Sequence, residues 1–154
     1  MRFSYNKNNS KWCGELLYVQ NEYSLTYKPY CKNINVSIII GAYTSLDTVI
    51  ETGEVVHMSG LNPKDTWIPK VMEFPKSEKG ELFVHFDKPP MKGTGKKYAE
   101  SWVTYCDPDN FFICIGNPNI EDSDVCIEFA NGIVAVIKKD QLISIWAKFR
   151  VIAP

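Results

Sequence analysis

The feature that most constrains the fold of this chain is an alternation of apolar with other residues at a period of two. In residues 34–40 a branched apolar side chain occupies every second position, and residues 81–86 and 125–130 follow the same rule. Successive side chains of a β-strand point to opposite faces, so this alternation gives each segment one apolar face. A helix, with about 3.6 residues per turn, would not sort these residues onto one face. The pattern therefore predicts a chain built mainly of half-buried strands.

Turn residues separate the strands expected in the C-terminal third. These strands cover residues 100–106, 111–115, 125–130, 133–138 and 143–151, and the last is expected to run without a break. Asp107–Asn110 (Asp-Pro-Asp-Asn) fits a type I turn, which favours Asp at its first position and Pro at its second. Asn131 and Gly132 favour a type I′ hairpin turn, which needs a positive φ at both central positions. With Lys139–Gln141 as a further turn, this third of the chain predicts an antiparallel β-meander.

The N-terminal half gives weaker patterns of the same kind. Strands are expected near residues 12–20, 23–28, 34–41, 46–51 and 54–59. Prolines in and around residues 66–74 make a long helix there unfavourable, and residues 88–97 are interpreted as an exposed, mobile loop. About ten short strands predict one mainly β domain over residues 1–154. It is an antiparallel sandwich or a partly open barrel that ends in the meander, with room for one or two short helices.

Composition excludes several classes of protein. The formal net charge of −1 argues against a dedicated nucleic-acid binder, which is usually basic. No apolar run approaches the ~20 residues that span a membrane, and no apolar stretch follows the polar residues 1–11 as a secretory signal requires. The five cysteines form no C-x-x-C pair, so we expect reduced thiols rather than a disulfide framework or a zinc site. We therefore expect a cytoplasmic protein with neither membrane nor nucleic acid as a direct partner.

The sequence contains no recognisable catalytic motif. The two histidines, His57 and His85, lack metal-ligand spacing, and we expect each to be at the surface or half-buried. Residues 88–97 fail as a phosphate-binding loop, because Pro90 occupies the place of the first glycine and Lys97 the place of the Ser or Thr. We predict no enzyme, no catalytic residue, no metal and no cofactor. A site assembled in space around His57 or His85 remains open as an alternative, since such sites are defined by geometry.

Charge is strongly segregated along the chain. Residues 98–137 contain seven Asp or Glu and no Lys or Arg, whereas residues 1–97 contain 13 basic and 10 acidic residues. The acids fall at turns and on outward faces of the expected meander, so we predict a negative surface that attracts a basic partner. Aromatic residues beside them are typical of interfaces. The predicted partner-binding residues are Trp102, Tyr105, Asp107, Asp109, Glu121, Asp122, Asp124 and Glu128.

The run Cys126–Ile137, followed by Leu142–Trp146, resembles the C-terminal hairpins of small bacterial immunity proteins. Such proteins are encoded beside the toxins of polymorphic or contact-dependent growth inhibition systems. The resemblance covers the last 40–50 residues, and the group has no common fold or catalytic motif, so no residue role is carried over. It implies a cytosolic inhibitor that binds and neutralises one cognate toxin domain, often a nuclease, with a basic surface. The alternative is a non-catalytic β-barrel protein that encloses a small ligand.

Overall fold

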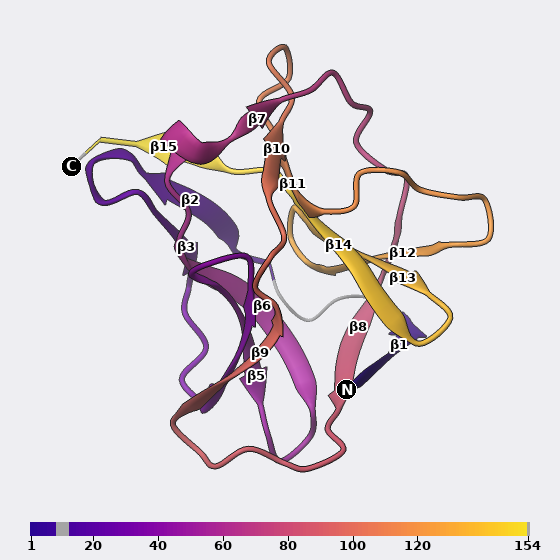
Figure 1. Cartoon of the computed structure of the whole chain (residues 1–154). Helices are drawn as coiled ribbons and strands as arrows, with labels where there is room; N and C mark the ends of the chain where they lie inside the picture. Colours follow the sequence, from indigo (N-terminus) through magenta and orange to yellow (C-terminus); the bar gives the residue numbers. More distant parts are fainter. Residues whose placement is uncertain (9–12, 154) are drawn as a thin grey trace.

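The computed structural model describes residues 1–8 and 13–153, which form a curled, open sheet shaped as a half-barrel (Figure 1). Strands make up 54% of the described residues, and no helix in this part of the chain reaches seven residues, which confirms the prediction of a mainly β, partly open barrel. The strands are β1 (Arg2–Lys7), β2 (Glu15–Val19), β3 (Ser24–Lys28), β4 (Val36–Ile40), β5 (Thr44–Val49), β6 (Glu54–Leu61), β7 (Ile68–Pro69), β8 (Glu78–His85), β9 (Thr94–Ala99), β10 (Thr104–Cys106), β11 (Ile113–Gly116), β12 (Val125–Ala130), β13 (Ile133–Lys138), β14 (Gln141–Ala147) and β15 (Arg150–Ile152). Two short 3₁₀ turns, η1 (Gln20–Glu22) and η2 (Lys64–Thr66), complete the elements.

The strand order is β15-β2-β3-β6-β8-β12-β13-β14-β11-β10-β7. β1 pairs with β8, and the hairpin β4–β5 joins the sheet at β6 and carries β9 on its other side. Most pairs are antiparallel, as expected, but β15 on β2, β9 on β4, β12 on β8 and β10 on β7 run parallel. An alternation of side chains reports which residues face the core and not which strand lies alongside, so these parallel pairs left no signal in the sequence.

The expected antiparallel meander is present only in β12, β13 and β14, because the hairpin β10–β11 pairs with the far side of β14 and not with β12. The ends of β12 and β13 coincide with the expected residues. The turn between them differs from the prediction, because Gly132 has a φ of +78° while Asn131 has no positive φ. Asn131 is instead held by tertiary contacts: its N–H donates to the Tyr27 hydroxyl, and its side-chain amide donates to the Gly14 carbonyl. A β-bulge between Glu128 and Ala130 accommodates the resulting turn.

The strand expected at 143–151 is interrupted. β14 ends at Ala147, and β15 begins at Arg150 on the other side of the half-barrel, where it pairs with β2. Both faces of β14 are covered, since Trp146 and Ser144 are as buried as Ile145. The chain therefore does not continue as one amphipathic strand but crosses from one part of the sheet to another.

Two packed layers explain this double burial. The inside of the half-barrel is filled by branched apolar and aromatic side chains, among them Leu16, Ile38 and Leu82. The outer face of the meander carries a second cluster around Trp146, which Met72 and Phe74 cover from the segment between β7 and β8. The interior is thus lined by apolar side chains from nearly every strand, as a close-packed core requires.

Three strands appear where the sequence predicted none, and the shortest is β7, within residues 66–74. β1 lies in the polar N-terminal segment, anchored by the buried Phe3. β9 occupies the end of the expected loop at residues 88–97. The first residue of the strand expected at 12–20 lies outside the described residues. At β1 the alternating Met1, Phe3 and Tyr5 pack on the core, but this pattern is short, and β9 has no such alternation. Both strands pair with distant parts of the chain, β1 with β8 and β9 with β4.

Candidate functional site

Asp107, expected on the partner surface, is buried at 1% exposure and organises the β10–β11 turn. Its Oδ2 accepts the Met72 N–H at 2.8 Å, and its Oδ1 accepts the N–H groups of Asn110 at 2.8 Å and Asp109 at 3.0 Å. These backbone donors, Met72 first, hold the pKa of the Asp107 carboxyl below its usual value. The side chain is therefore a turn anchor and is not available to a partner.

The acids before β12 are partly neutralised. The Lys138 ammonium lies 2.9 Å from Glu121 Oε2 and 3.9 Å from Asp124 Oδ1, and the Glu121 bond raises the pKa of Lys138. The Asp124 side chain is fully buried and its Oδ2 accepts the Glu121 N–H. Asp122 is exposed. Only part of this expected negative patch can reach solvent as free charge.

The pairing register keeps the acidic residues apart. Asp109 follows the last residue of β10, and this end of β10 lies beside the end of β14 at Ala147. Glu121 and Asp122 precede the first residue of β12, which pairs with Ile137 at the opposite end of β13 and β14. A six-residue strand is about 20 Å long, so these two groups lie at opposite ends of the sheet. The half-buried Glu128 accepts the Gly132 N–H within its own hairpin. The structure does not bring the predicted residues together into one negative surface.

Phe111, one of the aromatic residues beside the acids, is not among the predicted partner-binding residues, but it is the exposed ring of this turn. It has a φ of +56° and its side chain is 43% exposed, on top of Phe149 (ring centroids 5.4 Å apart) and Trp67 (6.3 Å). A bulky residue with left-handed backbone costs about 1–3 kcal/mol and persists only where its surroundings impose it. Here the Asp107 bonds impose it, and the Phe111 N–H donates to the Asp107 carbonyl. The acidic turn thus presents an aromatic ring to solvent.

Two recesses flank the exposed ring. The smaller, about 240 Å³, lies toward η2, and the larger, about 580 Å³, lies toward β8. We call the ring and its two recesses the Phe111 face. The smaller recess is lined by Lys64, Trp67, Pro69, Cys106, Pro108 and Phe111, and the larger by Met72, Glu73, Phe74, Asn110, Phe111, Phe112, Lys148 and Phe149.

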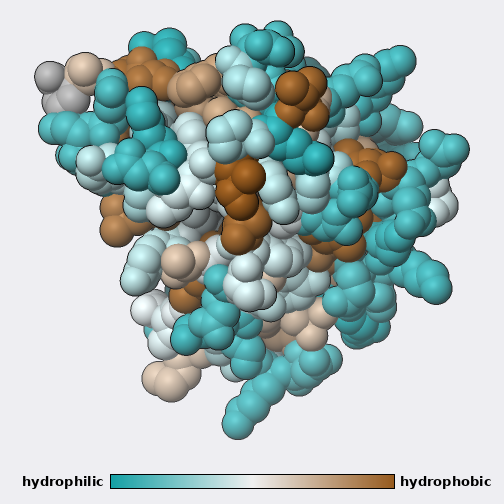
Figure 2. Space-filling model, turned by 45° about the horizontal axis from the view of Figure 1, so that its top comes forward, coloured by the Kyte–Doolittle hydropathy of each residue, from teal (hydrophilic) through white to brown (hydrophobic). Residues whose placement is uncertain are grey.

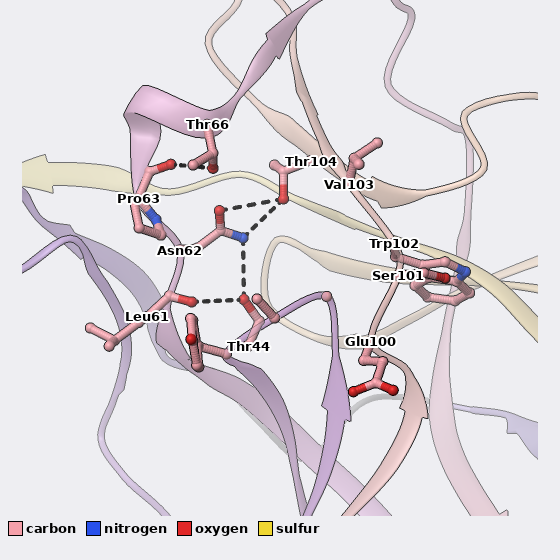
Figure 3. Close-up of a pocket in the computed structure, with 13 residues that line it drawn as sticks. Thr44, Leu61, Asn62, Pro63, Thr66, Glu100, Ser101, Trp102, Val103 and Thr104 are labelled. Carbon is pink, nitrogen blue, oxygen red and sulfur yellow. Dashed lines mark hydrogen bonds between the residues drawn. The ribbon is translucent and has the colours of Figure 1, made fainter.

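A third hollow of about 340 Å³ lies on the other side of η2 (Figure 3). Asn62 reaches across it, and its Nδ2 donates to the hydroxyls of Thr44 (3.2 Å) and Thr104 (3.1 Å). Asn62 Oδ1 accepts the Trp67 indole N–H at 2.6 Å. Both Nδ2 and Oδ1 of Asn62 are therefore hydrogen-bonded, and the residue links Thr44, Thr104 and Trp67. The bond to the indole N–H holds Trp67 in place, where its side chain lines the smaller recess.

Trp102 and Glu100 lie on the far side of this hollow from Asn62 (Figure 3). Trp102 is half-buried and packs against the inner core, while Glu100 is paired with Lys97 at 3.1 Å. Tyr105, the other aromatic expected to bind a partner, is half-buried against the outer cluster. Hydroxyl, amide and paired carboxylate groups can hold a ligand, but the lining offers no histidine or cysteine for catalysis.

His57 is fully buried, so the expectation that it is at the surface or half-buried was wrong. Its Nδ1 lies 2.9 Å from Asp47 Oδ2, and its Nε2 accepts the Cys31 N–H at 3.3 Å. The Tyr27 ring stacks on the imidazole with centroids 4.9 Å apart. Both ring nitrogens are occupied, so the geometry is that of a structural hydrogen-bonded pair. His85 is exposed, as expected, with Nε2 2.7 Å from the Ser4 hydroxyl.

The cysteines are free thiols that differ in exposure, which leads to a prediction. Cys114 is buried and Cys13 is exposed, and burial raises the pKa of the Cys114 thiol to about 12. At about pH 8 only ~10⁻⁴ of Cys114 is then the reactive thiolate. We expect iodoacetamide to label Cys13 in the native protein and Cys114 only after denaturation, as read by mass spectrometry of peptides. Equally fast native labelling of Cys114 would contradict this burial.

No protein-family model and no curated protein matches the sequence. In the part of the chain that the structure describes, no helix is long and apolar enough to cross a membrane. The same residues contain no group of three or more His, Cys, Asp or Glu side chains placed to hold a metal ion. The function is therefore argued from the Phe111 face itself.

Proposed function

We propose that the chain is an immunity protein that acts in the cytoplasm, where it binds a cognate protein toxin, such as a nuclease, and neutralises it without catalysis. The docking surface in this proposal is the Phe111 face rather than a continuous acidic meander. The observation that carries it is the exposed ring of Phe111, held in an unfavourable backbone conformation by a buried carboxylate. Strain of this kind concentrates at functional sites, and exposed aromatic residues beside recesses are the usual anchors of protein interfaces.

The surroundings of the ring support a protein partner. Ile68 (42% exposed) and Val71 (76%) add apolar surface in the segment that lines both recesses. On the face of the molecule that Figure 2 presents, apolar residues come to the surface in separate patches among hydrophilic ones. A mosaic of apolar anchors with a polar rim is typical of interfaces between proteins that also exist apart, as an inhibitor and its target do.

Co-expression tests the proposal. The gene product encoded beside this chain, or its C-terminal domain, is expressed alone and together with this protein, and growth of the host is measured. We expect the chain to restore growth and to form a one-to-one complex in size-exclusion chromatography. A neighbouring toxin that arrests growth equally with and without this chain, and forms no complex with it, would refute the proposal.

A further inference from the structure

We infer that the larger recess of the Phe111 face receives a basic side chain of the partner, an arginine or a lysine. This inference rests on the proposed function for the identity of the partner. It specifies the chemistry of the contact, which composition alone could not do because the chain as a whole is close to neutral.

The recess already holds a cation of the protein itself. The Lys148 ammonium lies 4.5 Å from the centroid of the Phe74 ring, in the geometry of a cation–π contact. Phe111, Phe112 and Phe149 complete an aromatic lining. Such faces attract cations, most strongly guanidinium groups that can stack on a ring. Lys148 is exposed, and the Phe74 ring is the contact of its ammonium among the described residues, so a cation of the partner can replace that ammonium.

Two carboxylates accompany the aromatic lining. Glu73 lines the recess, and Asp109 precedes Phe111 by two residues in the same turn. Both are exposed, and neither forms an ion pair with any residue in the described ranges 1–8 and 13–153. Once Lys148 leaves, the recess presents aromatic faces and the negative charge of Glu73, and Asp109 adds a second charge in the adjoining turn. An incoming arginine can stack on Phe111 and pair with Glu73, and Asp109 adds to the attraction.

Hexa-arginine peptide is the probe that tests this inference without the toxin, with hexaglutamate as the probe of opposite charge. Binding is measured by isothermal titration calorimetry at low salt. We expect Glu73→Gln and Asp109→Asn each to weaken hexa-arginine binding about three-fold, as expected for a partly exposed ion pair. Lys148→Met should tighten it by a similar factor, because the competing internal cation is removed. Asp122→Asn, at the opposite end of the meander, is the matched control and should change nothing.

The signs of these effects decide the matter. Weaker binding in Lys148→Met with tighter binding in Glu73→Gln, or a preference for hexaglutamate, would mean that the recess takes an acidic group, and the inference would be wrong. Equal affinity of all four variants for hexa-arginine would show that the peptide binds outside the recess, and this result would also refute the inference. The proposed function is judged separately: protection without the expected charge effects overturns only the inference, and charge effects without protection overturn only the immunity role.

Discussion

Replacing His57 by leucine is expected to lower the free energy of unfolding by about 3–5 kcal/mol, the usual effect of removing one partner of a buried ion or hydrogen-bonded pair. Asp47 is 2% exposed, and its carboxylate would lose the donor on Oδ2 and keep only the Ser59 hydroxyl on Oδ1. The Cys31 N–H would also lose its acceptor. Urea denaturation of the purified protein, followed by tryptophan fluorescence, measures the change.

His85→Leu is the matched control, since His85 is the other histidine and is exposed. We expect it to cost less than about 1 kcal/mol, as most surface substitutions do. The double variant Asp47→Ala/His57→Leu should lose less free energy of unfolding than the sum of the two single variants. In the double variant neither partner of the pair is left buried without the other. A loss below about 1 kcal/mol in His57→Leu would show that the pair is not buried as described.

The strands of the meander could be predicted because their sequence carries two independent signals. Alternation assigns the faces of β12 and β13, and the turn residues between them fix where each strand stops. β9 carries neither signal, and β1 carries only the short alternation of Met1, Phe3 and Tyr5. The backbone groups of both strands are satisfied by strands about 60 to 80 residues distant in the chain, and such pairing is decided by the assembled fold rather than by local preference.

The candidate site was predicted less well, for a reason visible at Asp107. Sequence gives a carboxylate its charge but not its surroundings, and a turn-initiating Asp can bond to its own turn instead of facing solvent. Asp107 does so, while Asp109 in the same turn remains exposed. The buried state of His57 was equally hidden, since its partner Asp47 lies on the neighbouring strand β5 and the contact depends on register. Charge counting therefore pointed to this turn but could not distinguish the buried Asp107 from the exposed Asp109.

Phe111→Asn should weaken binding of the cognate toxin by at least about 30-fold, the loss of 2 kcal/mol or more that defines an interface hot spot. Asparagine tolerates a positive φ, so the turn built by Asp107 keeps its shape while the exposed ring is removed. Relief of backbone strain offsets the lost contacts with Phe149 and Trp67, so the thermal midpoint of unfolding should change little. Surface plasmon resonance against the toxin domain gives the dissociation constant, and differential scanning calorimetry gives the midpoint.

Tyr23 provides an unusually close control for this substitution. It also has a positive φ, +54°, and is also 43% exposed, but it lies at the end of η1 and lines neither recess of the Phe111 face. Tyr23→Asn removes a ring of the same exposure from the same backbone conformation, so it should leave toxin affinity within about two-fold. If the two variants weaken binding equally, or if Phe111→Asn binds like the unchanged protein, the ring of Phe111 is not the anchor. A large loss of toxin affinity in Phe111→Asn alone, with an unchanged midpoint of unfolding, would show that the ring acts in recognition. A purely structural role would lower the unfolding midpoint along with the affinity.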